Sequence, residues 1–348
     1  MHRARSGGCA VALACMTLAC TAPPPVAARD DPRPAADAVT VTPLGAGDAF
    51  GPLAASANGQ LVFGIDESRR AVVAFDPRTP DRRRDAIAPA GAGVAAPVAL
   101  GCLPGDLVAV VTRSGEEWAL RTFRIAPAAA ADPSTPVQSL RVGRAAGGGA
   151  SVGLAVSQSR DWLAIAGLPE PVDPVVRAVF AGASVRPLSS EACPSVPAGR
   201  RVIAAAVSPA DELVLVDAST QGAAPAEVSF HDSAGREILR VDTGLFNVRG
   251  AAFTRGDGAL WLIADDATVV QQPAGLWRLD AVIRARRQAV RATCVARLPS
   301  PRGIACALER SIVVSHGGSK PGLVRIDPAA SRRPERENER EPEDQPPR

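Results

Sequence analysis

The run Leu260-Trp261-Leu262-Ile263-Ala264-Asp265 is one of six similar segments spread along the chain. Most of these apolar runs follow a turn rich in Asn, Gly, Pro or Asp, and another apolar run comes after each of them. The six segments are Leu61–Asp66, Leu107–Thr112, Trp162–Gly167, Leu213–Asp217, Leu260–Asp265 and Ile312–His316. They start 46, 55, 51, 47 and 52 residues apart. A repeat of strands with a period of about 50 residues predicts an all-β protein, a β-propeller with one blade for each copy.

Each repeat is expected to supply up to four strands. In the fourth repeat these are Val202–Val207, Leu213–Asp217, Glu227–Asp232 and Arg236–Val241. The inner runs are apolar throughout because both faces are buried between blades, whereas the outer runs alternate with charged residues. The last repeat lacks a fourth run, and Val39–Leu44 at the other end has no partner in the first repeat. We therefore predict a six-bladed β-propeller over residues 39–328, closed by an N-terminal strand that pairs with the last blade.

The composition suits stacked sheets and disfavours nucleic-acid binding. Hydrophobic residues make up 46% of the 348, but aromatic ones are few, with 8 Phe, 4 Trp and no Tyr. The formal net charge is +3, and loss of a leader that carries Arg3 and Arg5 lowers it to +1 (3 − 2). No basic field then remains to attract a nucleic acid. The scarcity of aromatic rings also weakens the hypothesis of a sugar-binding or peptidoglycan-binding module.

The N-terminus predicts export from the cytoplasm. His2–Arg5 is positively charged, and Gly7–Ala19 is an apolar run too short to span a bilayer, so residues 1–19 are expected to be a removable signal peptide. The segment Met16–Cys20 resembles the bacterial lipobox, in which the cysteine becomes the lipid-modified N-terminus. The resemblance implies that Cys20 is lipidated and, with Thr21 after it, that the protein lies on the periplasmic face of the outer membrane.

Two alternatives to this cell-envelope location stay open. Val11–Cys15 fits the lipobox pattern nearly as well as Met16–Cys20. Ordinary signal-peptide cleavage near Ala27 and Ala28 would instead give a soluble periplasmic or secreted protein.

Two segments outside the repeats lack the periodicity of folded structure. Residues 20–38 are rich in Pro and Ala, and we interpret them as a flexible linker after the lipid-anchored Cys20. Residues 329–348 are charged, with no aliphatic side chain larger than alanine, and are expected to form a disordered tail.

Four cysteines remain in the predicted mature domain, namely Cys102, Cys193, Cys294 and Cys306. In an oxidising compartment they can form two disulfides in any of three connectivities. Buried thiols are the alternative. No Cys-x-x-Cys pair occurs, which disfavours zinc, iron–sulfur and thioredoxin-like sites.

At the level of single repeats, the chain resembles NHL-repeat proteins and the gluconolactonase-like calcium enzymes. The segments that carry the resemblance are Arg249–Asp265, Gly275–Asp280, Pro301–Cys306 and Gly322–Asp327. The resemblance implies a six-bladed propeller, and in the lactonase-like enzymes it also implies a divalent cation held in the channel by oxygen ligands from several blades.

The ends of the second strands are the first candidate site. Asp66, Asp217, Asp265, Asp266 and His316 should share one rim of the ring. Carboxylates in such a place suit calcium, but a strand-end aspartate also commonly accepts hydrogen bonds from the following turn. We favour the second role.

Comparison with the lactonase-like pattern weakens the calcium site. Those enzymes carry Glu-Gly-Pro at the opening of the first repeat, with the glutamate as a metal ligand, and this chain has Phe50-Gly51-Pro52. The nearest match to their asparagine ligand is Asn247, and Arg302 stands at the corresponding place in the next repeat. A site without its glutamate would bind calcium weakly.

Arg249 and Arg302, each before a glycine at the start of a first strand, are expected to point toward the mouth of the channel, where they bind an anion or line a solvated rim. No Gly-x-Ser-x-Gly nucleophile motif occurs. Our hypothesis is a non-catalytic cell-envelope lipoprotein that needs no cofactor and binds an envelope protein or a small ligand on one rim. The alternative is a calcium-dependent lactonase-like or esterase-like hydrolase that uses Asp217, Asp265 and Asn247.

Overall fold

The computed structural model describes residues 39–47, 49–87, 96–125, 136–145, 152–157, 159, 161–170, 172–189, 193–222, 224–255, 257–279, 292–308 and 310–328. All of them belong to one compact unit. The predicted signal peptide (1–19), the linker that starts at Cys20 (20–38), the charged tail (329–348) and Asp280 lie outside the described residues.

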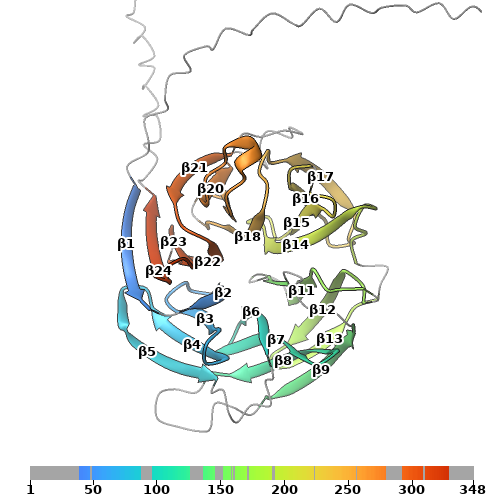
Figure 1. Cartoon of the computed structure of the whole chain (residues 1–348). Coiled ribbons are helices and arrows are strands. Elements are labelled where there is room, and N and C mark those ends of the chain that lie inside the picture. Colours follow the sequence, from blue (N-terminus) through green and yellow to red (C-terminus); the bar gives the residue numbers. More distant parts are fainter. Residues whose placement is uncertain are drawn as a thin grey trace, which may run out of the picture. The chain divides into compact units, whose positions relative to one another are not determined.

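The described residues form six four-stranded antiparallel sheets arranged in a ring (Figure 1). Blades 1 to 5 each use four consecutive strands. The first strands, which contact one another around the ring, are β2 (Phe50–Ala55), β6 (Pro97–Leu103), β10 (Gly153–Val156), β14 (Arg200–Val207), β18 (Val248–Phe253) and β22 (Pro301–Ala307). The second strands are β3 (Val62–Asp66), β7 (Leu107–Ser114), β11 (Trp162–Ala166), β15 (Leu213–Ser219), β19 (Leu260–Ala264) and β23 (Ser311–His316).

The outer half of each blade follows the same order. The third strands are β4 (Ala71–Asp76), β8 (Glu117–Arg124), β12 (Val175–Ala181), β16 (Glu227–His231), β20 (Gly275–Leu279) and β24 (Gly322–Pro328). The fourth strands of blades 1 to 5 are β5 (Thr79–Ile87), β9 (Gln138–Arg144), β13 (Ser184–Pro187), β17 (Glu237–Asp242) and β21 (Thr293–Arg297). The fourth strand of blade 6 is β1 (Val39–Ala46).

The predicted closure of the ring is confirmed. Strand β1 pairs with β24 in antiparallel register from Val39 opposite Pro328 to Ala46 opposite Gly322, with one irregularity between Pro43 and Gly45. The blue first strand therefore lies beside the red last one in Figure 1. The pairing covers the outer edge of β24, which would otherwise present unpaired backbone groups.

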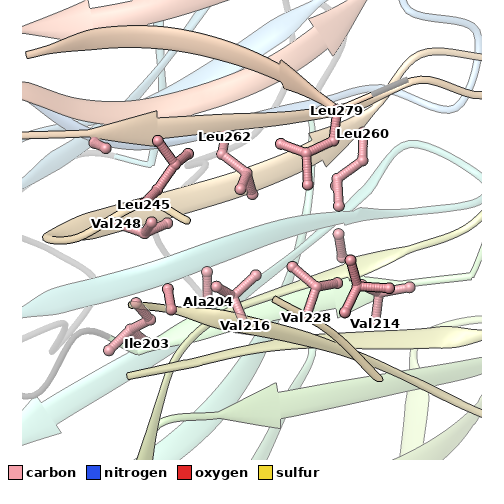
Figure 2. Packing of buried hydrophobic residues seen from close by; sticks show 14 of the residues in the cluster. Ile203, Ala204, Val214, Val216, Val228, Leu245, Val248, Leu260, Leu262 and Leu279 are labelled. Carbon is pink, nitrogen blue, oxygen red and sulfur yellow. The ribbon is translucent and has the colours of Figure 1, made fainter. Parts of the chain in front are cut away.

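The core is divided among the contacts between neighbouring blades, because each sheet is buried on both faces. Strand β19 shows the principle: Leu260, Leu262 and Ala264 pack against blade 4, while Trp261 and Ile263 pack against blade 6. Figure 2 shows the first of these contacts, in which Leu260 and Leu262 face Val214 and Val216 of β15. Alternate side chains pointing to opposite faces explain why the six diagnostic runs are apolar throughout.

Helical structure in the described part of the chain is limited to one turn of 3-10 helix, η2 (Thr268–Val270). No helix there has the length and apolar character needed to cross a membrane.

Candidate functional site

Two cavities follow the axis of the ring and are lined mainly by the first strands. We call the larger one, about 620 Å³, the polar cavity, and its charged lining residues are Glu67, Arg249, Asp265 and Arg302. We call the other, about 480 Å³, the apolar cavity, because small aliphatic residues such as Ala54, Ala155, Ala206, Ala252 and Ala305 dominate its wall. Both cavities share one residue from each first strand, namely Leu53, Leu100, Leu154, Ala205, Ala251 and Ile304. This ring of apolar side chains separates the two ends of the axis.

A repeated β-bulge selects side chains for the polar cavity. In blades 2, 4, 5 and 6 the pairing between first and second strand skips one residue, and the skipped residues are Val98, Ile203, Arg249 and Arg302. Each lies two positions before the residue that its strand contributes to the shared apolar ring, and each lines the polar cavity. In blade 1 the irregularity falls at Gly51 and Pro52. A bulge turns a side chain away from the regular alternation of its strand, so the fold itself directs this position to the cavity.

Two ion pairs supply the charges of the polar cavity. Arg249 Nε donates to Asp265 Oδ2 at 2.8 Å within blade 5. Arg302 Nη1 of blade 6 donates to Glu67 Oε2 at 2.5 Å, and Glu67 follows β3 in blade 1. The side chains of Arg302 and Glu67 are 40% and 46% exposed. Such a pair contributes at most about 1 kcal/mol to the stability of the fold, and its charges stay accessible to a ligand.

Two glycines lie beside the Arg302–Glu67 pair. A Cβ atom added at Gly51 would lie 2.7 Å from Oε1 of Glu67, and one added at Gly317 would lie 3.0 Å from Nε of Arg302. Both charged groups therefore lie close to backbone, and a side chain at either position would displace the charged group beside it.

Asp66 caps its turn and lines neither cavity. Its Oδ1 accepts hydrogen bonds from the Ser68 backbone N–H at 3.0 Å, the Ser68 hydroxyl at 2.6 Å and the Arg69 backbone N–H at 3.0 Å. The side chain is buried. This geometry corresponds to the strand-end cap that the sequence analysis favoured.

Asp217 is a buried member of an ion-pair network in blade 4. Its two carboxylate oxygens contact Arg200 Nε and Arg240 Nη1, the latter at 2.8 Å. Both arginines also pair with Glu227. Asp217 lines neither cavity, so its oxygens are committed to the blade.

Asn247 and His316 also lie outside both cavities. Asn247 adopts a positive φ of 50°, and its Nδ2 donates to the backbone oxygen of Asp266 at 2.8 Å. His316 is half-buried, and its Nδ1 lies 3.3 Å from the backbone oxygen of Gly317. Both side chains are thus engaged locally near the rim.

The sequence-predicted rim residues therefore separate into two sets. The structure brings Arg249, Asp265 and Arg302 together in the polar cavity. It leaves Asp66, Asp217, Asn247 and His316 outside it. The described residues contain no group of three or more His, Cys, Asp or Glu side chains that could hold a metal ion. The donor set of the lactonase-like calcium site does not fit this chain, since its glutamate position is Phe50, a buried core residue.

Glu67 and the apolar bulge residues Val98 and Ile203 were missed by the sequence analysis. Glu67 directly follows one of the six diagnostic runs, and a comparison of residues just after each run would have drawn attention to it. Val98 and Ile203 stand where Arg249 and Arg302 stand in their own blades, and aligning the first strands would have found them.

The four cysteines of the domain are thiols, so the disulfide alternative is not realised in this structure. Cys102 and Cys306 both line the apolar cavity. Burial raises the pKa of the Cys102 thiol and raises that of Cys306 to about 12. Both therefore stay protonated near neutral pH, which makes them poor nucleophiles and poor metal ligands.

Comparison with solved structures agrees with the fold. The chain is similar to the PQQ-bound aldose sugar dehydrogenase of Streptomyces coelicolor, with 13% identity and a TM-score of 0.54 over 84% of this chain and 98% of that one. A gluconolactonase from Xanthomonas campestris gives 15% identity and a TM-score of 0.52 over 83% and 89%. A glucose dehydrogenase gives 14% identity and a TM-score of 0.54 over 82% of this chain and 98% of that one. No protein-family model and no curated protein sequence matches the chain. At such identities the likeness shows a shared propeller fold, and a fold alone does not define an activity.

Proposed function

We propose that the protein is a cell-envelope lipoprotein, anchored through Cys20, whose propeller binds an envelope protein or a small ligand in the polar cavity without catalysing a reaction. One observation carries the proposal. The carboxylates that a calcium-dependent hydrolase would need are each held by hydrogen bonds inside the domain, whereas the charges gathered in the polar cavity are arginines and their partners.

The hydrolase alternative requires Asp217, Asp265 and Asn247 to surround one ion. Of these three, only Asp265 lines the polar cavity. Its Oδ2 accepts a hydrogen bond from Arg249, and neither of the other two residues is there to complete the roughly six to eight oxygen ligands that calcium takes. The arrangement favours recognition of charged ligand groups over binding of a metal ion.

Calcium is expected to leave the melting temperature of the domain unchanged. A site whose dissociation constant lies about 100 times below the calcium concentration would add about 2.7 kcal/mol to the free energy of unfolding and raise Tm by roughly 4 °C. Thermal unfolding at rising calcium, with magnesium at equal ionic strength as control, measures the difference. A calcium-specific rise that disappears in Asp265→Asn would contradict the proposal and restore the hydrolase.

Affinity capture from native envelope preparations is expected to depend on the polar cavity. The double variant Arg249→Gln, Arg302→Gln should lose the partner or ligand that the wild type retains, while Arg255→Gln, beside the apolar cavity, should retain it. Mass spectrometry of the same material should find the N-terminal peptide starting at an acylated Cys20. Identical captured sets from all three proteins would refute binding at this cavity, and an unmodified Cys20 would refute the anchor.

A further inference from the structure

The polar cavity has two chemically different halves. Going around the ring, blades 5, 6 and 1 contribute Arg249, Asp265, Arg302 and Glu67, whereas blades 2, 3 and 4 contribute Val98, Val152 and Ile203. The contrast falls at one structural position, since the bulge residue is an arginine in blades 5 and 6 and an aliphatic residue in blades 2 and 4. The cavity is therefore built to hold a molecule with a charged end and an apolar end.

The charges of the first half balance. Two guanidiniums and two carboxylates give no net charge. A simple anion would gain from the arginines but face Glu67 and Asp265, and a simple cation would meet the reverse conflict. A ligand with one group of each sign satisfies both, because its carboxylate can bind a guanidinium while its ammonium binds a carboxylate. Electrostatic complementarity thus selects a zwitterion.

The second half adds a requirement for apolar surface. Val98, Val152 and Ile203 form one wall, and Leu100 and Leu154 of the shared apolar ring lie at its base. An apolar group of the ligand that covers this wall adds roughly 25 cal/mol to the binding free energy for each Å² of apolar surface removed from water. A volume of about 620 Å³ lies within the usual range for small-molecule sites, roughly 300–1,000 Å³. The space suits an amino acid or a peptide of a few residues.

We infer that the polar cavity binds a small zwitterion with an apolar side group, that is, an apolar amino acid or short peptide whose ammonium and carboxylate are both free. The inference rests on the proposed function in that it takes the polar cavity as the binding site. It goes further by fixing the chemistry of the ligand. Arg302 and Arg249 hold the carboxylate, Glu67 and Asp265 hold the ammonium, and the aliphatic wall holds the side group.

A matched series of ligands tests each part of the inference by isothermal titration calorimetry on the mature protein. Leu-Leu is the reference, and free leucine distinguishes an amino acid from a peptide as the preferred source. N-acetyl-Leu-Leu lacks the cation, Leu-Leu-amide lacks the anion and Gly-Gly lacks the apolar groups. We expect leucine or Leu-Leu to bind, and each of the three altered ligands to bind at least tenfold more weakly than Leu-Leu.

Variants place the ligand in the cavity. Arg302→Gln should weaken Leu-Leu binding at least tenfold. Arg255→Gln should not change it, because Arg255 lines the apolar cavity and its guanidinium contacts the backbone oxygen of Ala57. Gly51→Ala keeps every charge but displaces the Glu67 carboxylate. It should therefore weaken the binding of Leu-Leu and of Leu-Leu-amide, which carry the ammonium, and leave the binding of N-acetyl-Leu-Leu unchanged. Unfolding curves check that each variant is folded. The ligand series uses the wild-type protein alone, so it tests the inference even where a variant fails to fold.

Two results would overturn the inference. One is equal binding of Leu-Leu and its acetylated or amidated forms, which would show that charge pairing does not matter. The other is no binding of leucine or Leu-Leu at millimolar concentration. If capture still depends on Arg249 and Arg302 in that case, the cavity is a binding site for a different chemistry and the proposed function stands. If capture is also independent of these arginines, both fall.

Discussion

A chain that begins at Gly47, and so lacks β1, is expected to lose cooperative folding. Strand β1 pairs with β24 over its whole length, and Leu44 of β1 is buried in the core between blades 6 and 1. Its removal exposes the edge of β24. The free energy of unfolding falls by about 1.5–3 kcal/mol for Leu44 alone and by about 1 kcal/mol for each backbone hydrogen bond that is lost. Domains are held by only about 5–15 kcal/mol.

The matched control is a chain that begins at Ala38 and keeps β1. Differential scanning calorimetry should show one sharp transition for the control and a broad or absent one for the shorter chain, with aggregation through the open edge visible in size-exclusion chromatography. If the two chains instead unfold in transitions of equal sharpness and similar Tm, blade 6 is stable with three strands and the ring does not depend on this closure.

The fold was predictable because its repeat is encoded locally. Each second strand needs apolar residues on both faces, so runs such as Leu260–Asp265 carry a period that survives without any knowledge of contacts. The closure by Val39–Leu44 was predictable for a different reason, because a strand without a partner at one end of the chain matched a missing strand at the other. Strand ends were less exact: β19 stops at Ala264, one residue before the aspartate, and β1 extends to Ala46.

The candidate site was predictable only in part. Arg249 and Arg302 stand out in the sequence because each precedes a glycine at the start of a first strand. The partner of Arg302 does not stand out, since Glu67 is 235 residues away and meets it only when blade 6 closes against blade 1. The bulges that turn these side chains toward the axis depend on pairing between strands, which no single run reveals.

The strand-end aspartates show why a repeat position does not define a role. Asp265 stands one place later in its repeat than Asp66 and Asp217, since Ala264 takes the equivalent position opposite Val248, and it faces the polar cavity. Asp66 and Asp217 do occupy equivalent places, opposite Phe50 and Val202, yet the first caps a turn and the second is buried in an ion-pair network. What differs is the neighbour that reaches each carboxylate. For Asp217 the neighbours are Arg200, at the start of β14, and Arg240, in the outer strand β17.

Asp217→Ala is expected to cost about 3–5 kcal/mol of unfolding free energy, the range for breaking a buried ion pair by removing one partner. The Asp217 side chain is 3% exposed, and those of Arg200 and Arg240 are 13% and 23% exposed. Burial acts to lower the pKa of Arg240, but hydrogen bonds to Glu237, Asp217 and Glu227 outweigh it and raise that pKa. Without Asp217, two guanidiniums in a partly desolvated site would share the remaining glutamates.

Asp265→Ala is the control, because Asp265 also ends the second-strand run of its blade but belongs to an ion pair whose arginine is 52% exposed. Its loss should cost about 1 kcal/mol or less, and 0.5 M salt should remove most of that difference while leaving the Asp217 effect largely intact. Urea unfolding of the two variants at low and high salt measures both. Equal costs at low salt would mean that burial does not distinguish the two aspartates.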